Sequence, residues 1–162
     1  MPNPDLLYHL TTKHDYISLQ VAEQVSVIQE LVKELGISVI IDEIIEVLQS
    51  KKEEEVFVVS LFLRGVCTKK SQRKDFDEVV AQFRSAIDKS DIFQIMNKNL
   101  YSTDRLIRET TYRTFGLTCF THNAHFLKEA SPYYKEHFPD QLEALESEYK
   151  WLINVAKDEA KR

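Results

Sequence analysis

The stretch DRLIRETTYRTFGLTC, residues 104–119, places a glycine inside a run that has the apolar spacing of a buried helix. Glycine in a helix interior costs on the order of 1 kcal/mol relative to alanine. The chain has only three glycines in 162 residues, so Gly116 should serve a purpose that alanine cannot. We expect another helix to cross closely at Gly116, because small residues let two backbones approach.

Length and composition fit one soluble domain built from helices. The chain is 43% hydrophobic and 29% charged, which is ordinary for a globular protein. Its three glycines and four prolines offer few turn signals, whereas a β-sandwich or barrel needs one about every 8 to 12 residues. The sequence therefore predicts a single all-α domain over residues 1–162, with about six to eight helices and an irregular leader at 1–14.

Apolar spacing predicts where the helices lie. Val21, Val25, Ile28, Val32 and Leu35 recur every three or four residues, and Gly36 follows as a C-terminal stop. Similar spacing predicts further helices over 38–50 (with Ser38 as N-cap), 53–67, 75–90, 91–99 and 103–120, over 122–131 before Pro132, and from Asp140 to the C-terminus. The basic stretch TKKSQRK, residues 68–74, is predicted to be a solvated loop.

An offset of 51 residues superposes two of these segments. Residues 40–67 then lie over residues 91–118, and Gly65 falls on Gly116. The second copy contains, in order, Asp104, Ile107, Arg108, Thr111, Thr114, Phe115 and Gly116. That series resembles the second helix of HEAT and armadillo repeats, which commonly has an acidic residue, Val-Arg, two alanines and Leu-Gly at these spacings.

The resemblance implies a right-handed α-α superhelix of stacked hairpins, a scaffold that usually presents a concave surface to another protein. The first copy departs from the pattern, since Phe57 stands where the arginine should be and Arg64 where the leucine should be. A spacer at 68–89 with its own helix separates the two copies, which argues against a regular solenoid.

No pattern of catalytic residues rises above the others, so we expect a protein that is not an enzyme and needs no cofactor. Cys67 and Cys119 lie in apolar helical patterns, where burial raises a thiol pKa, and the acidic run 53–55 suits a helix start. The alternative is a metal-dependent helical enzyme using His122 and His125, whose spacing of three allows a shared cation, with Glu129 as a further ligand. We expect capping or surface roles for both histidines, and no bound metal.

The charge pattern favours a protein partner. A formal net charge of -5 argues against nucleic-acid binding. The N-terminus lacks a signal peptide, and no apolar run approaches the ~20 residues of a membrane span. We therefore expect a cytoplasmic protein. A small acidic inhibitor of the immunity type, which blocks a basic toxin, is a narrower form of this prediction.

We predict that the partner binds in a groove formed by the second helices of the hairpins, through Arg105, Arg108, Tyr112 and Arg113. Arg108 is the weakest of these, because the matching arginine of the family more often makes structural contacts between repeats. The last helix has an apolar seam, and the sequence leaves open whether that seam packs on the preceding hairpin or forms a homodimer. The seam consists of Leu142, Leu145, Tyr149, Leu152 and Ala156.

Overall fold

The computed structural model describes residues 5–68 and 74–161, and these ranges contain helices and no strand. The prediction of an all-α protein is therefore confirmed. The longer helices are α2 (Val21–Leu35), α3 (Ile37–Ser50), α4 (Glu53–Thr68), α5 (Lys74–Lys89), α6 (Ile92–Asn99), α7 (Arg105–Thr118), α8 (Ala124–His137) and α9 (Pro139–Ala160). The predicted loop at 68–74 falls mostly on residues 69–73, outside the described ranges.

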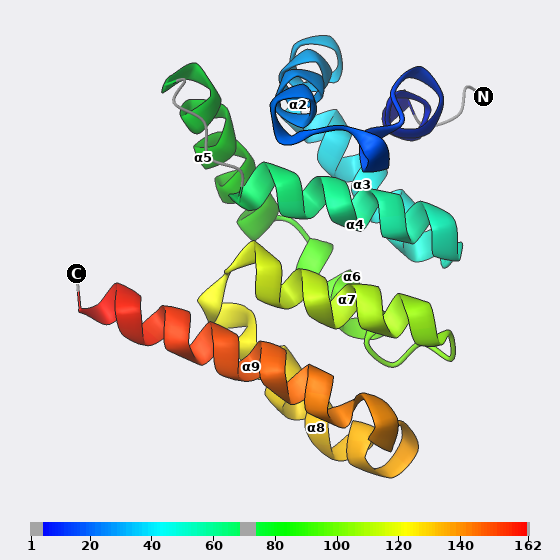
Figure 1. The fold of residues 1–162 in the computed structure, drawn as a ribbon, viewed down its shortest axis with the longest axis vertical. Helices are drawn as coiled ribbons and strands as arrows, with labels where there is room; N and C mark the ends of the chain where they lie inside the picture. Colours follow the sequence, from blue (N-terminus) through cyan, green and yellow to red (C-terminus); the bar gives the residue numbers. More distant parts are fainter. Residues whose placement is uncertain (1–4, 69–73, 162) are drawn as a thin grey trace.

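Within the described ranges, three helical hairpins, α3/α4, α6/α7 and α8/α9, form the main body (Figure 1). Their second helices α4, α7 and α9 lie side by side in one layer and run in the same direction, while α3, α6 and α8 lie behind them. The spacer helix α5 packs against α3 and α4 at one end of this arrangement. The two segments that the offset of 51 superposes are the first two of these hairpins.

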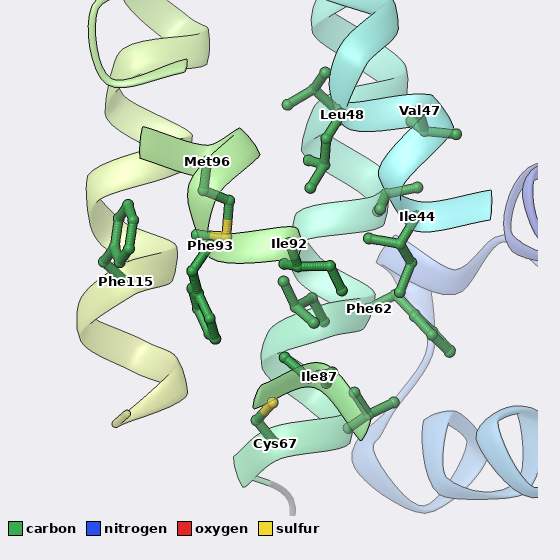
Figure 2. Close-up of a cluster of buried hydrophobic side chains, with 14 of the residues drawn as sticks. Ile44, Val47, Leu48, Phe62, Cys67, Ile87, Ile92, Phe93, Met96 and Phe115 are labelled. Carbon is green, nitrogen blue, oxygen red and sulfur yellow. The ribbon is translucent and has the colours of Figure 1, made fainter. Parts of the chain in front are cut away.

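The core gathers where the hairpins meet (Figure 2). Ile44 and Leu48 of α3 and Phe62 of α4 lie on one side of α6, and Phe93 of α6 approaches Phe115 of α7 with ring centres 5.8 Å apart. Ile87 brings α5 into the same cluster. Because α6 is apolar toward both neighbours, it joins the first hairpin to the second.

The N-terminal segment is more ordered than the sequence suggested. Residues 5–13 are helical, as α1 (Asp5–Leu7) followed by a π-helical turn (Tyr8–Lys13), so the prediction of an irregular leader at 1–14 is wrong for them. Leu6 and Leu10, four residues apart, are both buried in the core. The His9 imidazole also bonds the Glu34 carboxylate of α2 at 2.8 Å, which attaches the segment to that helix.

Gly36 joins α2 to α3, so that α2 ends and α3 begins at this residue. Its φ of +83° and ψ of 151° are open to glycine and costly for other residues. Gly36 is the C-cap of α2, as predicted, and also the N-cap of α3, so the prediction of Ser38 as N-cap is wrong. Val21 begins α2 but is 58% exposed, because the buried face of this helix is centred on Val25 and Ile28.

Helix α8 continues through Pro132, where the sequence predicted a stop. A proline inside a helix removes one hydrogen bond and costs about 3 kcal/mol. Packing on both sides of Pro132 offsets that cost, since Leu127 and Ala130 before it and Tyr134 after it are all buried. The Tyr134 hydroxyl also donates a 2.6 Å hydrogen bond to the Leu100 carbonyl at the end of α6.

Candidate protein-binding face

The outer surface of α4, α7 and α9 carries side chains that are not fully buried in the core. We call this surface the second-helix face, and define it by the residues that are exposed or half-buried along it: Phe57, Leu61 and Arg64 on α4, Leu106, Glu109, Arg113 and Leu117 on α7, and Glu148 and Trp151 on α9. The α4 and α7 members recur every three or four residues, so each set forms one stripe along its helix. Because the helices are parallel neighbours, the stripes lie next to one another.

A groove lies between α4 and α7 near the start of both helices. Its volume is about 280 Å³, and it is lined by Phe57, Leu106 and Thr110 together with Glu53, Glu54 and Glu109. Phe57 is 40% exposed and Leu106 is 50% exposed, although both are large and apolar. The groove thus has an apolar floor and an acidic rim.

The rim brings acidic groups from two helices together. Asp104 is the N-cap of α7, where its carboxylate accepts hydrogen bonds from the backbone N–H groups of Leu106 at 2.9 Å and Ile107 at 3.1 Å. A hydrogen bond to Asp104 is the largest cause that raises the pKa of the Glu53 carboxyl, followed by desolvation and by the charges of Asp104 and Glu54. Negative charge is therefore concentrated at this end of the groove.

Two of the four predicted partner-binding residues lie at the surface. Arg105 forms an ion pair with Asp140 of α9, and Arg113 forms one with Glu109 of its own helix at 3.3 Å. Both side chains are more than half exposed. Exposed ion pairs contribute little to stability, about 0 to 1 kcal/mol, so both arginines are free to exchange these partners for others.

The other two predicted residues, Arg108 and Tyr112, lie between helices and are 5% and 2% exposed. Arg108 donates to Gln141 of α9 at 2.8 Å and to the Ser102 carbonyl at 2.9 Å, and its guanidinium lies 3.6 Å from the centre of the Phe138 ring. Tyr112 packs edge-on against Tyr134. Neither side chain is accessible to a partner in this conformation, because Arg108 contacts α9 and Tyr112 packs between the hairpins.

Gly116 lies in the interior of α7, where α9 crosses it. A Cβ atom added there would meet the Glu148 side chain, with its Cδ at 2.9 Å and its Cβ at 3.4 Å. The Trp151 indole N–H donates a 3.0 Å hydrogen bond to the Gly116 carbonyl, one of the last carbonyls of α7. The prediction of a close helix crossing at Gly116 is therefore confirmed, and Trp151 presents a ring of fixed orientation at the surface.

Two further arginines hold the helices together, and sequence reasoning assigned no role to either. Arg64 of α4 donates to the Thr114 hydroxyl at 2.9 Å and the Thr110 carbonyl at 3.1 Å on α7. Arg84 of α5 donates to the carbonyls of Cys67 at 3.2 Å and Thr118 at 2.8 Å, so one guanidinium caps the C-terminal ends of α4 and α7. Their positions along the sequence give no sign of this, because the carbonyl partners lie on other helices.

The residues considered as metal ligands or as nucleophiles do not come together in one site within the described chain. His122 bonds Asp88 of α5 at 2.7 Å, while the His125 ring nitrogen faces the His122 carbonyl at 2.8 Å. In the described part of the chain, no group of three or more His, Cys, Asp or Glu side chains is arranged to hold a metal ion. Both cysteines are free thiols, and burial raises the pKa of the Cys67 thiol to about 12.

Comparisons of the chain with protein-family models, with curated proteins and with solved structures found no match. Among the helices described, none is long and apolar enough to cross a membrane.

Proposed function

We propose that the protein is a non-enzymatic interaction module, a helical-repeat scaffold of the HEAT and armadillo kind, whose second-helix face binds a protein partner. One observation carries the proposal: the groove between α4 and α7, where Phe57 and Leu106 line a space of about 280 Å³. Single exposed apolar residues are common on protein surfaces, but a pair of them lining one groove is typical of interaction sites.

The remainder of the face supports the same function. Trp151, which is 48% exposed, is held by its hydrogen bond to Gly116, and Arg105 and Arg113 lie exposed along α7. Tryptophan and arginine are the side chains that most often dominate binding energy at protein interfaces. An aromatic ring whose orientation is already fixed loses little conformational entropy when a partner covers it.

The narrower proposal is a small acidic inhibitor of the immunity type. The net charge of -5 and the acidic rim of the groove would attract a basic partner and speed its association. The cytoplasmic location and a homodimer through α9 remain predictions. The apolar seam of α9 already packs within the chain, where Leu145 and Leu152 are buried against α7 and α8.

The test is site-specific capture of the partner at the groove. A photoreactive benzoylphenylalanine is placed at Phe57 in one full-length variant and at Val39 of α3 in another, and each is irradiated in extract from the native host. Val39 is the matched control because it is also apolar and 44% exposed. We expect a protein that crosslinks at Phe57 and not at Val39.

The captured partner is then purified and its affinity measured by calorimetry. Leu106→Ala should weaken binding at least tenfold, the loss of a well-buried apolar contact of about 1.4 kcal/mol or more, and Val39→Ala should leave it unchanged. Equal crosslinking at both positions, or an affinity that Leu106→Ala does not alter, would contradict a partner site in this groove.

A further inference from the structure

If the proposed function is correct, the groove between α4 and α7 also indicates which kind of partner segment it binds. Its volume of about 280 Å³ is small for a groove that would take a whole helix. It suits one large apolar side chain, which would lie between the Phe57 ring and the Leu106 side chain. The occupant therefore enters with a single anchor residue instead of covering the groove with an extended apolar face.

Among the acidic groups of the rim, Glu109 has a cationic partner, whereas Glu53 and Glu54 have none within the described residues. Lys52 pairs with Glu55 and Arg113 pairs with Glu109, but within the described residues no lysine or arginine forms an ion pair with Glu53 or Glu54. The nearby Asp104 carboxylate also raises the pKa of the Glu53 carboxyl, as expected where like charges gather without a cation between them.

We infer that the groove binds a basic segment of the partner, in which one large apolar side chain enters between Phe57 and Leu106 and a neighbouring lysine or arginine lies against Glu53, Glu54 and Asp104. The apolar contact supplies most of the affinity, because it is the part that excludes water. The charged contact supplies selectivity and association rate, because it lies at an exposed rim. An acidic segment is excluded by repulsion from the same carboxylates.

Unbiased selection of peptides tests this inference without the natural partner. Random twelve-residue peptides displayed on phage are selected on the immobilised full-length protein, and the enriched peptides are synthesised with a fluorescent label. We expect a consensus with one large apolar residue flanked by lysine or arginine. Binding measured by fluorescence polarisation should weaken at least tenfold with Leu106→Ala and should weaken as salt is raised.

A charge-reversal pair tests the rim. Glu53→Lys with Glu54→Lys should weaken the selected peptides about tenfold or more. The control is Asp77→Lys with Glu78→Lys, which makes the same change in net charge at two adjacent exposed residues near the start of α5. A control variant that weakens binding as much would show that net charge alone acts, and would overturn the assignment of the cation to this rim.

The two proposals fail in different ways. An acidic or neutral consensus, or peptides whose affinity is unaffected by Leu106→Ala, would overturn the basic, singly anchored occupant. If the natural partner still crosslinks at Phe57 in that case, the groove remains the binding site and only its assigned occupant is wrong. If the partner crosslinks equally at Val39, the proposed function fails whatever the peptides do.

Discussion

Replacing Gly116 by alanine should have two effects of opposite sign on the free energy of unfolding. Alanine is the better helix former by about 1 kcal/mol, so Gly116→Ala in an unobstructed helix would stabilise the fold by that amount. In this protein the new methyl group would overlap the Glu148 carboxyl, with the Glu148 Cδ only 2.9 Å away. Glu148 is half-buried between the charges of Arg64 and Arg113, and burial raises the pKa of its carboxyl.

The Glu148 side chain must therefore shift when the methyl group is present. Displacing a χ angle about 30° from its staggered rotamer costs about 0.5 to 1.5 kcal/mol, which cancels the gain in helix propensity. We expect Gly116→Ala to leave the free energy of unfolding within about 0.5 kcal/mol of the wild type. In a Glu148→Ala background the obstruction is gone, and the same substitution should stabilise by about 1 kcal/mol.

Urea unfolding of the four proteins in this cycle, with the transition midpoint and the m value compared, measures the coupling between the two positions. Gly36→Ala is the control. A Cβ there has nothing within 4 Å, yet φ is +83°, so that variant should lose about 1 to 3 kcal/mol from backbone strain alone. Full stabilisation by Gly116→Ala in the wild-type background would refute the close crossing as the reason for this glycine.

Three other substitutions and one reagent test the packing. Tyr16→Phe should raise the free energy of unfolding by about 1 kcal/mol, because the buried hydroxyl has no hydrogen-bond partner in the described chain, whereas Tyr134→Phe should lower it similarly by losing its bond to a carbonyl; the reverse order in urea unfolding would contradict both. Arg84→Met should cost about 2 to 3 kcal/mol by leaving helix-end carbonyls without a charged donor, and an unchanged thermal midpoint would show that these bonds contribute nothing. Iodoacetamide should modify Cys119 in the folded protein and Cys67 only after unfolding, since Cys67 is buried with a raised thiol pKa; equal labelling by mass spectrometry would be inconsistent with this burial.

Most helix positions could be predicted because apolar spacing and helix-end residues agreed. Helix α4 is an example, since its β-branched residues favour a strand, but three glutamates at its first turn favour a helix start, and the helix begins at Glu53. Pro132 shows the limit of such signals. A proline stops a helix only when the free energy that it costs locally exceeds the stabilisation from packing. That packing depends on residues far away in the sequence.

The exposure of the residues expected to bind a partner was harder to predict, because a helix in a layered stack is buried on several sides. Arg108 and Tyr112 are polar and were expected at the surface. Helix α7 lies between α4 and α9, however, and both side chains are buried there. Threonines are also buried along α7, where the hydroxyls of Thr111 and Thr114 donate to the carbonyls four residues before them, at 2.6 and 2.7 Å. Polarity was thus a poor guide to exposure in this helix. Phe57 did carry a signal, as an aromatic residue where the repeat pattern expects arginine.

The stacking order explains why the offset of 51 detects two hairpins while the described chain contains three. Gly65 and Gly116 are buried in α4 and α7, and each of these helices packs against the second helix that follows it. Helix α9 is the last second helix of the stack and contains no glycine, and it places Glu148 and Trp151 over α7. The described chain therefore includes one second helix, α9, that lacks the shared glycine. An alignment that depends on the pair Gly65 and Gly116 accordingly detects two of the three described hairpins, and the third is recognised only from its packing.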